Sequence, residues 1–203
     1  MKRSAIPLLV VLMISMTGVT LAQSGHADIS ANLAGVFGQS VTGQGIQQTP
    51  TNSAGALFSL RYYLNRYAGV EANYGYTRNS QDYNFGFGNV VGVQSGVHEV
   101  TGAFVLRGGH GPVRPFVLAG GGVLVFNPTS SALNTTGLPL SRENRPAFLY
   151  GGGADIRLAK AVALRAQYRG LVYQAPDFHD AADLHTGVTM HTAEPTVGLV
   201  FKF

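Results

Sequence analysis

Eight segments of strand character follow one another along the chain, and the connections between them alternate between long and short. The segments have about eleven residues each, a length that lets a tilted strand cross a bilayer. They are residues 29–39, 54–64, 68–78, 97–107, 114–126, 147–158, 162–173 and 192–203. The short connections are NRY, GGHGPV and AKA, and the other four are long. Up-and-down antiparallel strands would place all long loops at one end of the sheet and all tight turns at the other.

Polar and apolar residues alternate within most of these segments. In VALRAQYRGLV, Arg165, Gln167 and Arg169 share one face, while Leu164 and Tyr168 share the other. A period of two places each set on one face of a sheet. The segment 114–126 is apolar on both faces, so its sequence does not indicate which face points inward.

The polar face carries charges of both signs, which is unusual for strands. An eight-stranded barrel has an interior about wide enough to be filled by side chains. If the apolar face met lipid, the charges would lie in that lumen, and unpaired charge there is costly. We therefore expect ion-paired networks and no open pore. The expected lumen charges are Arg61, Glu71, Glu99, Arg107, Asp155, Arg157, Arg165, Arg169, Glu194 and Lys202.

Composition narrows the class of protein. Charged residues make up 12% of the chain, against about 25% in an ordinary soluble domain. There is no cysteine, which excludes disulfides and Cys-based metal sites. After residue 22 no apolar run could form a transmembrane helix, and only closed barrels otherwise satisfy their backbone in lipid. The sequence therefore predicts an all-β fold, an eight-stranded antiparallel up-and-down transmembrane β-barrel with four long extracellular loops and three short periplasmic turns.

The first 22 residues have the pattern of a secretory signal. Lys2 and Arg3 precede a long apolar run, and a small residue, Ala22, marks the expected cleavage site. The alternative is a membrane-anchoring helix, but the run is short for a span. We expect a signal peptide over 1–22 and one barrel domain over 23–203. The remaining positive charges are scattered, so no nucleic-acid partner is expected.

Aromatic residues gather near both ends of the expected strands. Tyr62, Tyr63, Tyr67, Phe201 and Phe203 lie at the tight-turn end, and Tyr74, Tyr76, Phe126, Phe148 and Tyr173 lie near the long loops. This distribution predicts two aromatic belts at the membrane surfaces.

Residues that could carry chemistry are few. Ser30 and Ser59 lie mid-strand, while His98 and Glu99 are on opposite faces and do not converge as a base and its orienting group. The sequence therefore predicts no enzyme and no cofactor. The last long loop holds Asp177, His179, Asp180, Asp183, His185 and His191. Their spacing matches no zinc motif, so no metal site is expected.

Taken together, the signal, the alternating loops and the terminal VGLVFKF resemble the small outer-membrane β-barrel proteins of the OmpA/OmpX type, the porin-like outer membrane protein β-barrel domain group. The resemblance covers residues 23–203 and implies a bacterial outer-membrane location, with outer-membrane lipid as a partner. It also implies that Leu199, Phe201 and Phe203 are read by the barrel-assembly machinery. We expect a monomer, and no wall-binding domain after the barrel.

The resemblance is specific for architecture, so alternative functions stay open. The first is a structural or surface-interaction barrel with a lumen filled by charged side chains. The second is a narrow passive porin-like channel for ions or small solutes. The third is a soluble secreted lipocalin-like carrier, which would need an apolar interior.

Overall fold

The computed structural model describes residues 26–84, 86, 90–109, 111–129, 141–178 and 186–203. The expected signal peptide, residues 1–22, lies outside this part. Among the described residues, no helix is long and apolar enough to cross a membrane.

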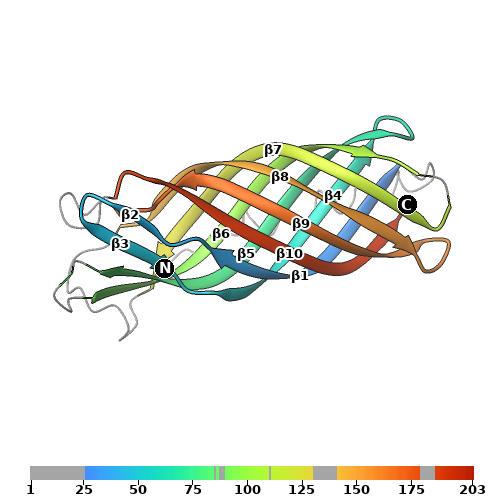
Figure 1. The fold of residues 1–203 in the computed structure, drawn as a ribbon. Helices are drawn as coiled ribbons and strands as arrows, with labels where there is room; N and C mark the ends of the chain where they lie inside the picture. The colour runs from blue at the N-terminus through green and yellow to red at the C-terminus, as the bar shows by residue number, and fades with distance from the viewer. Residues whose placement is uncertain (1–25, 85, 87–89, 110, 130–140, 179–185) are drawn as a thin grey trace, which may run out of the picture.

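Eight strands of the described part close into an antiparallel barrel, as predicted (Figure 1). Neighbouring strands pair in chain order, and the barrel closes where β1 pairs with β10. The barrel strands are β1 (Ala27–Gly38), β4 (Ser53–Tyr63), β5 (Ala68–Asn84), β6 (Val90–Arg107), β7 (Val113–Pro128), β8 (Glu143–Arg157), β9 (Val162–Gln174) and β10 (Thr189–Lys202).

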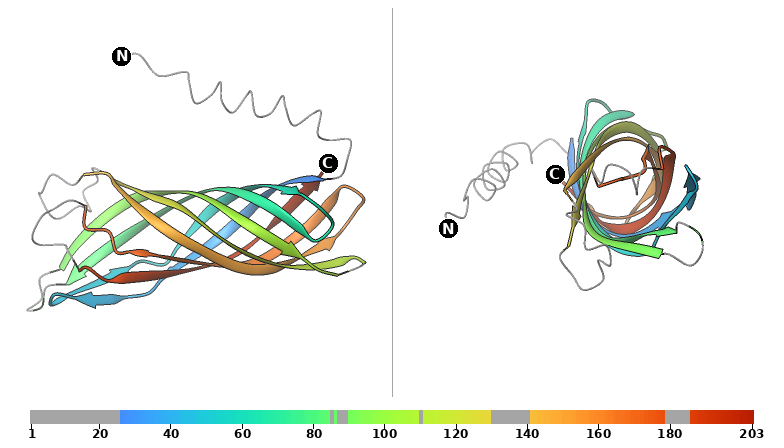
Figure 2. Two further views of the ribbon diagram at one scale, coloured as in Figure 1. Left: turned by 90° about the horizontal axis from the view of Figure 1, so that it is seen from above. Right: turned by 90° about the vertical axis from the view of Figure 1, so that its left-hand side faces the viewer.

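The two ends of the barrel differ in the length of the connections between strands. The connections 64–67, 108–112 and 158–161 are short and lie at one end. The start of β1 and the end of β10 meet at this same end, where Asp28 is paired with Lys202. The other four connections, most of them longer, join strand ends that lie at the other end (Figure 2).

The long-connection end contains more strand than the sequence predicts. The first connection folds into a hairpin of β2 (Val41–Gly43) and β3 (Ile46–Pro50), and β3 pairs with the far end of β5. The second predicted loop is mostly wrong, because β5 and β6 stay paired from Ala68 to Asn84. Its Asn, Gly and Ser residues indicate a turn, but pairing with two neighbouring strands overrides that local preference.

The outer face of the barrel is apolar and the inner face holds the charges. Leu33 and Phe104 point outward with 73% and 70% of their surface exposed, whereas Arg165 and Arg169 point inward and are fully buried. A soluble lipocalin-like carrier needs the opposite arrangement, so that alternative is wrong. The outward apolar face fits lipid.

Part of the interior is apolar, mainly on β6 to β9. Phe116, Leu118, Leu124 and Phe126 all point inward, which settles the orientation of the ambiguous segment 114–126. They pack with residues of neighbouring strands such as Leu149.

The aromatic belts are only partly as predicted. Tyr62 and Tyr67 at the short-turn end, and Tyr74, Tyr76 and Phe148 towards the other, are exposed on the outside. Tyr63, Phe126 and Tyr173 are instead buried in the lumen, because each has the inward parity of its strand.

Candidate functional site: the barrel lumen

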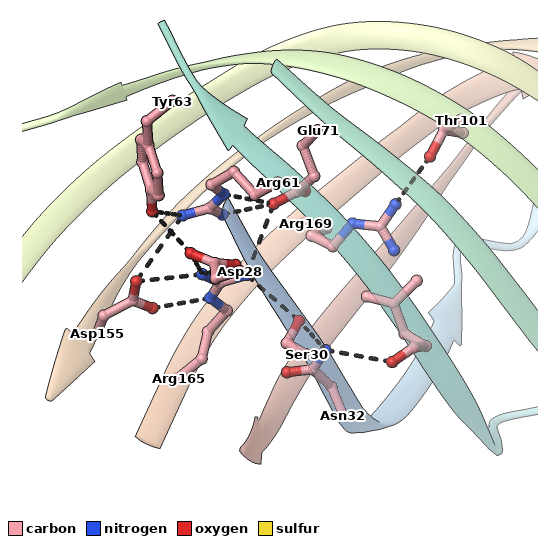
Figure 3. Close-up of polar contacts among 11 residues, drawn as sticks. Asp28, Ser30, Asn32, Arg61, Tyr63, Glu71, Thr101, Asp155, Arg165 and Arg169 are labelled. Atoms are coloured by element: carbon pink, nitrogen blue, oxygen red, sulfur yellow. Dashed lines mark hydrogen bonds and ion pairs between the residues drawn. The ribbon is translucent and has the colours of Figure 1, made fainter. Parts of the chain in front are cut away.

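The half of the lumen near the short turns holds a group of buried ion pairs, here called the inner cluster (Figure 3). It consists of Asp28, Arg61, Glu71, Asp155 and Arg165, each at most 3% exposed. Arg165 Nε donates to Asp155 Oδ1 at 2.7 Å, and Nη2 donates to Oδ2 at 3.1 Å. Nη2 also lies 3.3 Å from Asp28 Oδ1. The two bonds to Asp155 give a forked geometry that fixes the guanidinium as well as neutralising it.

Arg61 forms the second half of the inner cluster. Its Nε donates to Glu71 Oε2 at 2.8 Å, and Nη1 lies 3.9 Å from Asp155 Oδ2. The Phe116 ring lies beneath the guanidinium, 4.3 Å from Cζ to the ring centroid. Tyr63 completes the group by donating its hydroxyl to Asp28 Oδ2 at 3.0 Å. Five strands thus contribute to one hydrogen-bonded group across the lumen.

A second group, the outer cluster, lies further from the short turns and centres on Arg169. Arg169 is four residues beyond Arg165 on β9, so it shares the inward face about 13 Å further along the strand. Its Nη1 lies 2.9 Å from Glu194 Oε2 and 3.3 Å from Glu99 Oε2, and Nη2 also pairs with Glu99. Thr101 Oγ1 accepts from Nη2 at 3.3 Å. Since Glu99 is on β6, this ion pair spans the lumen.

Between the two clusters lies a belt of uncharged polar side chains. Ser59, Asn73, Gln167 and Thr196 are buried, and each has a side-chain oxygen or nitrogen without a partner among the described residues. Buried polar groups are nearly always hydrogen-bonded, to ordered water where the protein offers no partner. We therefore expect bound water in this belt.

Beyond the outer cluster the lumen contains a cavity of about 40 Å³. Glu99 and Glu194 lie at its floor, and Leu57, Val97 and Tyr173 are among its walls. Space on this scale holds a few water molecules. The lumen is therefore filled at two levels by ion pairs, and a small cavity lies above the second level.

The expected lumen charges do not all lie at one depth. Seven are buried in the two clusters, namely Arg61, Glu71, Glu99, Asp155, Arg165, Arg169 and Glu194. Arg107 and Lys202 are half-buried at the short-turn mouth, and Arg157 is exposed there. Arg107 lies over the Tyr63 ring, 3.8 Å from Cζ to the centroid.

Sequence reasoning missed three charged residues of the interior. Asp28 belongs to the inner cluster but stands one residue before the predicted first strand. Glu143 and Arg145 fall in a predicted loop, yet they begin β8 and point inward. Continuing the strict alternation by one residue before the first predicted strand and by four residues before the strand 147–158 would have found them.

The other candidate residues lie apart from one another. Ser30 and Ser59 face the lumen, whereas His98 is on the outer side, with Nδ1 2.8 Å from the Tyr74 hydroxyl. Asp177 pairs with Arg145, and His191 Nε2 lies 2.8 Å from the Tyr150 hydroxyl on the outer side. The remaining candidates of that loop, His179, Asp180, Asp183 and His185, fall outside the described residues.

The C-terminal residues singled out by sequence all lie on the outer face. Leu199, Phe201 and Phe203 are 44%, 46% and 38% exposed, while Val200 between them is buried in the lumen. The last strand therefore presents an apolar ridge to the surroundings of the barrel.

The family model for the outer membrane protein beta-barrel domain matches residues 6–203. The chain belongs to this family. It is accordingly an outer-membrane β-barrel, located in the bacterial outer membrane and in contact with its lipid. No curated protein matches the chain in sequence.

Solved structures of small outer-membrane barrels have the same fold. Neisserial surface protein A superposes with a TM-score of 0.61 at 16% identity, over 89% of this chain and 98% of that one. The outer membrane protein OprG from Pseudomonas aeruginosa gives 0.62 at 14% identity, over 88% and 96%. Ail, the attachment invasion locus protein of Yersinia pestis, gives 0.51 at 18% identity, over 88% and 99%. At these identities the likeness is one of fold.

Proposed function

We propose that this protein serves a structural or surface-interaction role as a non-catalytic, monomeric barrel whose lumen does not conduct. The observation that carries the proposal is the pair of ion-pair clusters, centred on Arg165 and Arg169, that span the lumen at two levels. Opening a path through them would separate buried opposite charges, which is strongly unfavourable. The names of two similar structures, a surface protein and an attachment invasion locus protein, support a role at the cell surface.

The test is conductance in planar lipid bilayers. Purified, folded protein should leave the membrane current at the level seen with detergent alone. Step-like current increments of uniform size would contradict a closed lumen and would favour the channel.

A narrow passive channel is the second candidate, and a specific observation favours it. The belt of Ser59, Asn73, Gln167 and Thr196 has polar atoms ready to bind water, and the cavity continues the space above the outer cluster. In that case the Arg169 side chain would act as a movable barrier. Current from the wild-type protein, carried preferentially by cations past the remaining carboxylates, would support this candidate.

We further propose that the last strand is the feature read by the barrel-assembly machinery, through Leu199, Phe201 and Phe203. The support is the outward position of all three side chains, next to the β1–β10 closure. A recognised ridge must be accessible before the barrel closes, and this one is on the outside.

The proposed signal peptide, residues 1–22, has its own test. Determining the N-terminal sequence of the protein extracted from membranes should return Gln23 as the first residue. Recovery of a chain that begins at Met1 would favour the membrane-anchoring alternative.

A further inference from the structure

The described residues that follow β9 turn into the barrel mouth at the long-connection end. Ala175 and Phe178 are 6% and 0% exposed, although they belong to a connection between strands. In the end-on view of Figure 2, the orange-to-red chain between β9 and β10 lies within the ring of strands. Residues 175–178, here called the lid, therefore occupy the mouth.

Phe178 anchors the lid by filling an apolar site. Its ring packs edge-on against Phe126, 6.4 Å between centroids, within the buried cluster that includes Tyr173. Its backbone has a φ of 55°, a region that a bulky residue adopts only where the surroundings hold it. The site is thus specific enough to maintain an unfavourable backbone conformation.

Glu143, at the start of the neighbouring strand β8, holds the lid backbone. One oxygen, Oε2, accepts from the Asp177 amide at 2.8 Å and from the Phe178 amide at 2.5 Å. The Glu143 side chain is buried and also pairs with Arg145, whose Nη2 lies 3.0 Å from Asp177 Oδ2. Charge-assisted bonds to backbone amides are among the stronger hydrogen bonds in proteins.

A third contact fixes the middle of the lid. The Tyr83 hydroxyl donates to the Pro176 carbonyl at 2.8 Å, and Tyr83 is fully buried. This tyrosine is on the part of β5 that extends beyond the predicted strand. Strands β5 and β8 thus hold the lid from two sides.

We propose that residues 175–178 form a lid, latched by Glu143, that controls access from outside to the outer half of the lumen. The cavity is lined by Phe126 and Tyr173, which belong to the same apolar cluster as Phe178, and on the other side by Glu99 and Glu194 of the outer cluster. This cavity, here called the chamber, therefore lies next to both the site that Phe178 fills and the outer cluster. Its opening needs no conduction through the barrel, so this inference goes beyond the proposed function.

The chain contains no cysteine, so one introduced thiol reports access without background. Val97→Cys places the reporter on the chamber wall, and Asn144→Cys places one on the exposed rim beside the latch. Intact cells are treated with a membrane-impermeant maleimide, whose rate of reaction reports how accessible each thiol is from outside the cell. Folding of each variant is checked by its mobility on unboiled gels.

The latch is tested with Glu143→Ala, and Asp82→Asn on the same rim is the matched control. We expect the Val97→Cys thiol to react slowly in the otherwise wild-type chain and roughly tenfold faster or more with Glu143→Ala, since the amides of Asp177 and Phe178 lose a charged acceptor. Asp82→Asn should change nothing, and the Asn144→Cys thiol should react equally fast in all backgrounds. Phe178→Ala removes the anchor without touching Glu143 and should also raise the chamber rate.

Two results would overturn the proposal. If Val97→Cys reacts as fast as Asn144→Cys in the wild-type background, residues 175–178 do not close the mouth. If folded Glu143→Ala and Phe178→Ala both leave the chamber rate unchanged, Glu143 is not a latch. Conductance of the wild-type protein is measured separately, so failure of the lid and failure of the closed lumen are distinguishable.

Discussion

Arg165 and Asp155 are joined by two parallel hydrogen bonds across neighbouring strands in a lumen where neither side chain is exposed to solvent. The register of β8 and β9 places them directly opposite each other. Such a pair costs free energy to desolvate, and the geometry of the fork offsets that cost. Loss of one partner would leave the other charge buried without its main counter-charge.

Removing the carboxylate alone should be strongly destabilising. Asp155→Ala leaves the Arg165 guanidinium buried with fewer partners, and we expect a loss of about 3–5 kcal/mol in the free energy of unfolding. Adding Arg165→Met should recover part of that loss, because the double variant no longer buries the unpaired charge. Unfolding by guanidinium chloride in lipid vesicles gives the free energy of unfolding of the wild type, the two single variants and the double variant. Additive losses would show that the two side chains are not coupled.

Gly75 faces the lumen and Gly102 faces outward, so the same substitution should have different effects at the two positions. A Cβ at Gly75 would lie 3.2 Å from the Glu99 Cβ and carboxylate, whereas one at outward-facing Gly102 meets only the Glu71 carbonyl oxygen, at 3.8 Å. Gly75→Val should therefore push Glu99 away from Arg169 and cost about 1–3 kcal/mol. Gly102→Val should be neutral or slightly stabilising, since a β-branched residue suits a strand. Equal effects in vesicle unfolding would contradict the assigned faces.

The depth of an outward-facing residue should set the cost of a charge there. Leu33 lies mid-strand on β1, and Leu64 lies just after β4 at the short-turn end. We expect Leu33→Arg to lower the free energy of unfolding from bilayers by about 2–4 kcal/mol, and Leu64→Arg by about 0–1 kcal/mol. In a soluble barrel both positions would face water, and the two substitutions would have similarly small effects.

The proposed role of the last strand in barrel assembly can be tested separately from the contribution of its outward side chains to stability. Phe203 and Phe104 both point outward, but only Phe203 belongs to the terminal ridge. Phe203→Ala should slow the appearance of folded barrel in membranes several-fold, whereas Phe104→Ala should not. Pulse labelling followed by unboiled gel electrophoresis gives the folded fraction against time. Equal rates for the two variants would remove the recognition role from Phe203.

Alternation and loop length were sufficient to predict the barrel, because a period of two assigns the face of every strand residue once one charge is placed inside. Arg61, Glu71 and Arg169 follow directly from that parity. The same rule also places Tyr63 inside, but its aromatic character favoured a membrane belt. Parity, which the backbone imposes, is the stronger constraint of the two.

The features that sequence could not predict depend on contacts between distant segments. The extension of β5 to Asn84 is stabilised by pairing with β3 and β6, neither of which a local pattern reveals. The Glu143 latch likewise requires the carboxylate of one loop end to meet amides more than thirty residues away. Local propensity at those positions indicates turns.

A closed barrel, with charges inside and apolar side chains facing lipid, can be tested by the gel mobility of the protein extracted from membranes, with and without boiling. A closed hydrogen-bonded barrel resists detergent, so the unboiled protein should be found in the membrane fraction and migrate differently from the boiled one. Identical migration, with the protein in the soluble fraction, would contradict the account, because the apolar outer face would then have to lie in water.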